Sequence, residues 1–255
     1  MSALREWAFR TWYWYVNSID QNGEILFMNY GYSDPASPVA LDLRDEANRY
    51  SIQLYDLLAR AVDLKGKDIA EVGCGRGGGL SYIARKYMPA TALGVDLDRQ
   101  AVSFCNQHYR LAGLAFQQGD AQQLNLKDGS FDALFNVESS HRYPRMELFL
   151  REVKRLLRPQ GYFLFVDFRY DHEIAELNNQ LLATGMKIIG EQSITANVVE
   201  ALQADDSRKR TLVQKLAPRC LQTIALNFAG AVGSETYNQF ASRKYEYRFY
   251  IVQKI

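Results

Sequence analysis

Short apolar runs alternate with segments whose apolar residues recur at helical spacing through the middle of the chain. Apolar runs bounded by turns predict buried strands, and apolar positions three or four residues apart predict helices. Alternation of this kind is typical of crossover units on a parallel sheet. The expected strands are 68–73, 92–96, 115–119, 131–137, 162–168 and 187–192, and the expected helices are 79–87, 99–111, 145–157 and 172–184.

The end of the chain carries a different pattern. Residues 244–254 alternate between apolar and polar positions and are rich in aromatic residues, which predicts a seventh strand. No clear helical pattern separates this strand from residues 226–240, so we expect an antiparallel, hairpin-like addition to the sheet. Just before the strand at 162–168, "LRPQG" (157–161) is expected to stop a helix at its proline and to turn into the strand.

These elements predict an α/β fold with a doubly wound, mostly parallel seven-stranded sheet and an antiparallel last strand. The expected core spans residues 68–194, and the final strand lies within 244–255. The two flanks contain no repeats or low-complexity tracts. We expect residues 1–67 to form a helical lid and residues 195–243 to form a cap beside the substrate.

Composition excludes several function classes. The 255 residues carry a formal net charge of +1 with acids and bases intermixed, so nucleic acid is not an expected partner. Cys74, Cys105 and Cys220 are scattered and lack CxxC spacing, which argues against a disulfide framework and a zinc site. No apolar run approaches the roughly 18–20 residues of a membrane span, and the N-terminus lacks an export signal. We therefore expect a soluble, cytoplasmic protein without stable membrane insertion.

A glycine-rich loop, "AEVGCGRGGGL" (70–80), joins the first strand to a helix. Glycines let the backbone turn tightly and approach a ligand, while free N–H groups at a helix start favour a carboxylate or phosphate. Gly73, Gly75 and Gly78 also satisfy the dinucleotide fingerprint, and Asp96 lies near the offset of an acid that binds a ribose. The loop predicts a nucleotide-type cofactor without choosing one, and a turn without ligand is the alternative.

Four segments together resemble the ordered motifs of class I S-adenosylmethionine-dependent methyltransferases. These segments are "EVGCGRGGG" (71–79), "GVDLD" (94–98), "GDAQQL" (119–124) and "FDALFNVESSH" (131–141). "LRPQG" is similar to the family's "LRPGG", with Gln160 as the departure. The resemblance implies a Rossmann-like methyltransferase fold, S-adenosylmethionine as cofactor and S-adenosylhomocysteine as product.

The resemblance also implies roles for individual residues. Gly73 and Gly75 would lie against the methionine part of the cofactor, Asp96 would hold both ribose hydroxyls, and Leu97 would pack on the adenine. Asp120 would accept a hydrogen bond from the adenine amino group, although capping a turn is its alternative role. Glu71 would organise the loop from beneath, and Ala121 would offer a backbone N–H. The other residues expected at the cofactor are Tyr30, Cys74 and Asn136.

A closer resemblance reaches into the flanks. Residues 45–79, "NVESSHRYP" (136–144), "GYFLFVDFR" (161–169), "FMNYGYSD" (27–34) and "LNFAGAVGSETYNQF" (226–240) are similar to bacterial lipid and natural-product O-methyltransferases. Among these are the mycobacterial phthiotriol dimycocerosate and glycopeptidolipid methyltransferases. This likeness implies O-methylation of a lipid-like or other small-molecule acceptor. Substrates diverge readily within such a group, so the reaction class is better supported than any named acceptor.

His141 and Asp167 are the candidate catalytic residues. His141 follows the fourth strand and Asp167 ends the fifth. Neighbouring strands lie about 5 Å apart, and ligands bind at the carboxyl ends of such strands. An imidazole that takes the hydroxyl proton would accelerate methyl transfer by roughly 10²–10⁴-fold, with the aspartate orienting the ring. Similarity to the rebeccamycin sugar O-methyltransferase implies the same pair. The alternatives are that His141 caps a helix or donates to a backbone carbonyl, and that Asp167 caps the helix opened by residues 171–173.

The remaining segments suggest covers and a pocket. The aromatic residues of 5–20 predict a helix that packs on the core, lines an apolar wall or contacts an interface. Tyr30 and Tyr32 lie on a glycine-containing loop that is able to close over the cofactor. "ADDSRKR" (204–210) is expected to be a solvated helix face. "VDFRY" lacks the Asp-Asn pair of magnesium-dependent relatives, so we expect no metal.

The favoured function is methyl transfer from S-adenosylmethionine to a hydroxyl of a lipid or small natural product, with His141 as base. The nearest alternative is a C-methyltransferase of the sterol or terpenoid kind, in which aromatic rings would stabilise a carbocation. A dinucleotide-dependent oxidoreductase and a cofactor-binding module without catalysis are further alternatives. The sequence identifies neither the acceptor nor the oligomeric state.

Overall fold

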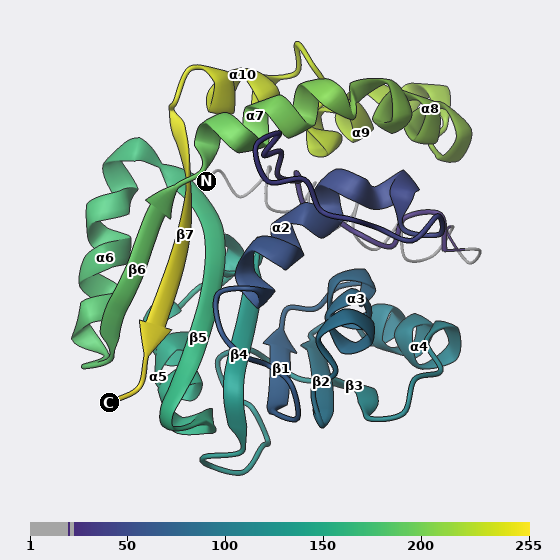
Figure 1. Ribbon diagram of the computed structural model, residues 1–255. Coiled ribbons are helices and arrows are strands. Elements are labelled where there is room, and N and C mark those ends of the chain that lie inside the picture. The colour runs from purple at the N-terminus through teal and green to yellow at the C-terminus, as the bar shows by residue number, and fades with distance from the viewer. Residues whose placement is uncertain (1–19, 21–22) are drawn as a thin grey trace.

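The computed structural model describes residues 20 and 23–255, which form a seven-stranded sheet in the order β3-β2-β1-β4-β5-β7-β6. β1 to β5 run parallel, and β7 pairs antiparallel with β5 on one side and with β6 on the other (Figure 1). The predicted α/β fold is confirmed. The strands are β1 Asp68–Val72, β2 Thr91–Asp96, β3 Leu114–Gln118, β4 Phe131–Val137, β5 Leu157–Tyr170, β6 Lys187–Ser193 and β7 Tyr245–Gln253.

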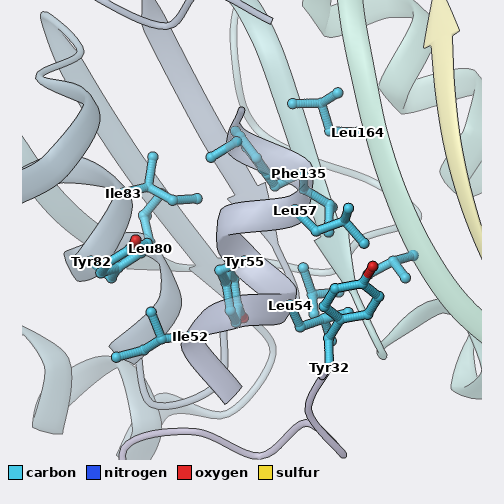
Figure 2. Close-up of a cluster of buried hydrophobic side chains, with 14 of the residues drawn as sticks. Tyr32, Ile52, Leu54, Tyr55, Leu57, Leu80, Tyr82, Ile83, Phe135 and Leu164 are labelled. Atoms are coloured by element: carbon cyan, nitrogen blue, oxygen red, sulfur yellow. The ribbon is translucent and has the colours of Figure 1, made fainter. Parts of the chain in front are cut away.

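Helices cover both faces of the sheet because successive side chains of a buried strand point in opposite directions. Phe135 and Leu164 belong to the cluster that contains α2 and α3, whereas Leu134 and Phe163 belong to the cluster that contains α5 and α6. Figure 2 shows the first cluster around α2. The helices of these two faces are α2 Arg49–Ala59, α3 Gly78–Tyr87, α4 Arg99–His108, α5 Met146–Leu156 and α6 Ile174–Ala183.

Four further helices lie between β6 and β7 in the chain and extend across the end of the sheet toward which the parallel strands point (Figure 1). They are α7 Thr195–Ala204, α8 Asp206–Leu216, α9 Gln222–Ala229 and α10 Glu235–Ala241. The prediction that residues 226–240 pair with the last strand as a hairpin is wrong, since these residues form the second half of α9 and nearly all of α10. Gly230, with φ 65°, ends α9, and the Ser234 side chain caps α10.

The segment "LRPQG" also differs from its prediction, because it belongs to β5. Phe131 pairs with Leu157 and Ala133 with Tyr162, so residues 158–161 bulge outward opposite a single residue of β4. The bulge is held by backbone hydrogen bonds between Gln160 N and Lys254 O and between Lys254 N and Gly161 O. The aromatic helix expected at 5–20 lies outside the described residues except for Asp20.

Gln160 lies in the left-handed region of backbone space, with φ 65°. A side chain costs about 1–2 kcal/mol in this conformation, whereas glycine adopts it freely but loses about 0.5–1 kcal/mol of backbone entropy. We expect Gln160→Gly to raise the free energy of unfolding by roughly 0.5–1 kcal/mol. Urea unfolding monitored by circular dichroism measures this change. Gln160→Ala, which keeps the Cβ, is the control and should not stabilise the protein; equal stabilisation by both variants would refute the backbone argument.

Candidate active site

A cavity of about 800 Å³ opens at the carboxyl ends of the central strands. One part of its wall comes from the glycine loop and from the ends of β2 and β3. The other part comes from residues 24–30, the loop after β4, and the helices α8 and α9. The cavity therefore lies where open α/β sheets bind their ligands.

The glycine loop bends sharply and lies against the loop that follows β4. Gly73 has φ 77°, and a Cβ there would lie 1.9 Å from Ser139 Oγ, so no larger residue fits. Gly73 N and Cys74 N donate to Val95 O at 2.7 and 3.1 Å. Both Gly73 and Cys74 line the cavity. Because Gly73 has no side chain, a ligand in the cavity can contact its backbone directly.

Asp96 joins the glycine loop to β2. Its carboxylate accepts hydrogen bonds from Gly75 N at 2.8 Å and from Asp98 N at 2.9 Å, one on each oxygen. Each oxygen has a second lone pair, which leaves it able to accept from a ribose hydroxyl. Burial raises the pKa of Asp96. The adjacent Leu97 is 66% exposed and lines the cavity, as expected of a residue that packs on a flat ring.

Asp120 and Ala121 lie on the wall beyond β3. Asp120 Oδ1 accepts from Gln122 N at 2.9 Å and from Gln122 Nε2 at 3.2 Å. Asp120 therefore caps a turn, as its alternative role predicted, and it lines the cavity as well. The two roles are compatible because a carboxylate has about four acceptor positions.

Glu71 and Asn136 lie beneath the loop, away from the cavity wall. Both are fully buried, and Asn136 Nδ2 donates to Val72 O at 2.8 Å and to Tyr143 Oη at 3.1 Å. The contact of Asn136 with the cofactor stays a prediction, and in the structure its amide supports the strand end under Gly73. Glu71 Oε1 accepts from Tyr55 Oη at 2.7 Å, consistent with support from below, and burial raises the pKa of Glu71 to about 8.

His141 and Asp167 meet as predicted. Asp167 is fully buried, and its Oδ1 lies 2.8 Å from His141 Nδ1. Asp167 Oδ2 accepts from His141 N at 2.9 Å and from Ser140 Oγ at 2.7 Å, and Arg169 Nη1 lies 3.1 Å away. The pKa of Asp167 is held low by the facing His141 and Arg169 despite its burial. The carboxylate thus orients the loop after β4, whereas the alternative cap at residues 171–173 is formed by Tyr170 and Glu173.

The ring of His141 lines the cavity and packs on Phe168, with ring centroids 4.4 Å apart. Because Nδ1 faces the carboxylate, the neutral ring carries its proton there and presents a lone pair at Nε2. Nε2 accepts from Arg142 Nε at 3.2 Å. Burial is the largest influence on the pKa of His141 and lowers it. The ring is therefore neutral at physiological pH.

Glu138 and Lys209 are cavity residues that the sequence analysis missed. Glu138 has φ 48°, is partly buried and accepts from Tyr30 N at 2.7 Å and from Tyr247 Oη. Lys209 is 8% exposed, and its Nζ donates to Tyr30 O at 3.4 Å. The interpretation of 204–210 as a solvated face is therefore wrong at Lys209, because α7 and the Tyr30 segment enclose that side of α8. Burial raises the pKa of Glu138 to about 8 and lowers that of Lys209 to about 8.

The segment 24–30 roofs the cavity and is fastened at three places. At its start, Glu24 N and Ile25 N donate to the Asp20 carboxylate at 2.9 and 2.7 Å. The buried Arg76 of the glycine loop holds Asp20 in turn, with Nη2 2.6 Å from its backbone oxygen and 3.2 Å from Oδ2. Lys215 Nζ of α8 lies 2.6 Å from Glu24 Oε1. At the other end, Tyr30 is held between Glu138 and Lys209 and packs edge-on against Phe168. The expected cofactor residue Tyr30 is thus a wall of the cavity.

Comparison with known proteins identifies the family. A methyltransferase domain matches residues 70–165. The fatty-acid O-methyltransferase of Mycolicibacterium smegmatis is 40% identical over 243 residues, which are 95% of this chain and 88% of that protein. The phthiotriol/phenolphthiotriol dimycocerosates methyltransferase of Mycobacterium tuberculosis is 39% identical over 248 residues, or 97% and 92% of the two chains. The chain belongs to the methyltransferase family.

Solved structures share this fold at lower identity. A cyclase has a TM-score of 0.72 and 19% identity, with 96% of this chain and 94% of that chain covered. A geranyl diphosphate methyltransferase in complex with S-adenosylmethionine has a TM-score of 0.66 and 14% identity, with 91% and 100% covered. Because one of these is described as a cyclase, the fold alone does not determine the chemistry. The assignment as a methyltransferase rests on the sequence relatives and the matched domain.

This methyltransferase uses S-adenosylmethionine as its cofactor. The cavity fits that molecule, since the bare backbone at Gly73, the acceptor oxygens of Asp96 and the exposed Leu97 follow one another along one wall. Residues 20 and 23–255 contain no group of three or more His, Cys, Asp or Glu side chains that could hold a metal ion. Within the same residues, no helix combines the length and the apolar character that crossing a membrane requires.

The buried carboxyls of Glu71 and Glu138 generate a pH prediction. Their pKa values of about 8 mean that both are protonated in the folded protein up to about pH 8, whereas in the unfolded chain they are ionised above their usual pKa of about 4.5. The unfolded state therefore binds fewer protons, and stability should fall as the pH rises from about 6.5 to about 8, by up to about 1.4 kcal/mol per pH unit and carboxyl. Urea unfolding at several pH values measures the slope.

Glu71→Gln should reduce this slope, because the amide of glutamine does not ionise. The exposed Glu147 on α5 provides the matched control, and Glu147→Gln should leave the slope as in the wild type. A slope that is unaffected by Glu71→Gln would show that Glu71 is ionised in the folded protein.

Proposed function

We propose that this enzyme transfers the methyl group of S-adenosylmethionine to a hydroxyl of a lipid-like acceptor, with His141 as the general base. The observation that carries the proposal is the His141 ring, which lines the cavity while its Nδ1 is bound to the buried Asp167. Relatives named for lipid methylation, at 40% and 39% identity, support a lipid-like acceptor.

The cofactor supplies an electrophilic methyl group on a positively charged sulfur. Gly73, Gly75, Asp96, Leu97 and Asp120 are the residues proposed to hold it, because they line one continuous wall. Cys74 and Ala121 contribute to the same wall. The acceptor would then occupy the remaining part of the cavity, between that wall and the helices α8 and α9.

The proton of the acceptor hydroxyl would pass to His141 Nε2 as the hydroxyl oxygen forms a bond to the methyl carbon. The bond between that carbon and sulfur would break, which would leave S-adenosylhomocysteine. A neutral imidazole is required, and the lowered pKa of His141 provides it at neutral pH. Arg142 Nε, 3.2 Å from Nε2, would give way to the hydroxyl. Asp167 is ionised and would stabilise the imidazolium that forms, after which the proton would leave to solvent.

Rings of Phe168, Tyr30 and Tyr245 also line the cavity, which keeps C-methylation as a second candidate. Aromatic faces would stabilise a carbocation at a double bond. The two candidates differ in their acceptors, since C-methylation requires an alkene. Mass spectrometry of products from alcohols and alkenes of matched length separates them.

His141→Ala should lower kcat by roughly 10²–10⁴-fold, because the hydroxyl proton loses its acceptor. The dissociation constant of S-adenosylmethionine, measured by isothermal titration calorimetry, should change little, because the wall proposed to hold the cofactor does not include His141. Arg142→Lys, which keeps a positive charge beside the ring, is the comparison variant and should retain much more activity. Unchanged turnover in His141→Ala would refute the base.

The pH dependence of kcat/KM should reveal the same ring. Since burial lowers the pKa of His141, activity should fall on acidification with a midpoint below pH 6.5. Asp167→Asn removes the carboxylate that favours the charged ring, so the midpoint should move to still lower pH, together with a loss of turnover from the wrong tautomer. Initial rates from pH 5 to 8 test both statements, and a wild-type profile without an acid limb would contradict them.

A further inference from the structure

The burial pattern of α8 is the reverse of that of an ordinary surface helix. Lys209 is its only buried residue, whereas Leu212, Val213 and Leu216 are half-buried. These four positions have the spacing i, i+3, i+4, i+7 and therefore share one face of the helix. All four line the cavity. The apolar face of α8 is thus part of a cavity wall and is not packed into the core.

The helix α9 presents a matching face. Ala225, Phe228 and Ala229 have the spacing i, i+3, i+4 and line the same cavity. α8 and α9 pack against each other, and they lie side by side in Figure 1. Together the two faces form an apolar strip, which we define as Leu212, Val213 and Leu216 of α8 with Ala225, Phe228 and Ala229 of α9.

The inner end of the strip points toward the proposed base. Lys209 Nζ contacts Tyr30 O at 3.4 Å, the Tyr30 ring packs on Phe168 at 5.7 Å, and Phe168 packs on His141 at 4.4 Å. From Lys209 to Leu216 the helix rises about 10 Å, at about 1.5 Å per residue. The strip therefore leads away from the reacting centre over a distance comparable with a medium-length aliphatic chain.

Lys209 has donors to spare among the described residues. An ammonium has three N–H groups. Within the part of the chain that the structure describes, Lys209 donates one long hydrogen bond, to Tyr30 O. Buried cations ordinarily have several close polar partners, because leaving a charge unpaired in an apolar environment is costly. An oxygen of a bound ligand would complete its hydrogen bonding.

We propose that the aliphatic chain of the acceptor lies along this apolar strip and that Lys209 donates a hydrogen bond to an oxygen of its polar head. This inference rests on the proposed methyl transfer to a lipid-like acceptor. The chemistry that Lys209 recognises is an oxygen lone pair, which either a hydroxyl or a carboxylate supplies. Lys209 is a specificity residue, since its contacts reach His141 only through Tyr30 and Phe168.

The first test is a chain-length series of octanol, decanol and dodecanol with the matching carboxylic acids, in which kcat and KM are measured by mass spectrometry of the methylated product. KM should fall with length by roughly fourfold per methylene group at first, as expected for burial of a CH₂ group. Binding of the same compounds is measured in parallel by calorimetry in the presence of S-adenosylhomocysteine, so that no reaction is needed.

Leu212→Trp fills the strip. It should raise KM for the dodecyl acceptor at least tenfold and for the octyl acceptor much less, with cofactor affinity unchanged. Leu182→Trp, at an exposed leucine of α6, is the matched control and should resemble the wild type. A length dependence that survives Leu212→Trp unchanged, or is absent in the wild type, would overturn the chain site even if methylated product forms.

Lys209→Met keeps the side-chain length but removes the ammonium, and Lys209→Arg keeps a cation. The methionine variant should raise KM at least tenfold for one or both head groups while arginine restores most of the affinity. The larger loss, with acids or with alcohols, identifies the head group. Equal KM values in wild type and Lys209→Met, with the same melting temperature, would overturn the role of Lys209.

The proposed function and the chain site fail in different ways. Length-dependent binding by calorimetry with no methylated product from any acceptor would refute the proposed function and leave the chain site intact. Methylated product without any length dependence would do the reverse.

Discussion

The buried carboxylate of Asp167 positions most of the active site. It receives two N–H groups and a hydroxyl from the loop that follows β4, and the guanidinium of Arg169 faces it. With this loop fixed, His141 lies against the cavity, Ser139 fills the space beside Gly73, and Glu138 reaches the backbone of Tyr30. The carboxyl end of β5 therefore positions the proposed base, the glycine loop and the roof segment relative to one another. The arrangement is possible because β4 and β5 are parallel neighbours.

Burial alone does not decide the charge of the acidic groups in this site. Asp167 and Glu71 are buried and Glu138 is partly buried, and in each case desolvation favours the neutral carboxyl. Asp167 faces His141 and Arg169 and stays ionised, whereas the two glutamates accept hydrogen bonds from tyrosine hydroxyls and a backbone N–H. The low-dielectric interior strengthens each of these differences. The same environment thus provides a charged partner for the proposed base and neutral supports for the surrounding loops.

The helices α8 and α9 make apolar the side of the cavity that we propose for the acceptor. α8 and α9 lie across the end of the sheet (Figure 1). Their apolar faces line the cavity. The roof segment 24–30 closes the same space and is tied to the glycine loop by the buried pair of Arg76 and Asp20. The glycine loop, the roof segment and α8 are therefore connected by a few polar contacts.

The sequence by itself determined the order of elements, the glycine loop and the pairing of His141 with Asp167. Each of these depends on local pattern or on the fixed geometry of parallel strands. The tertiary structure decided the features that need distant partners. Lys209 lies in a charged stretch that looks solvated until Tyr30 and the cap enclose it, and Asn136 lies under the loop because Val72 and Tyr143 accept its amide. The helices at 222–241 and the bulge at Gln160 likewise depend on how β7 inserts between β5 and β6, which no periodicity along the chain records.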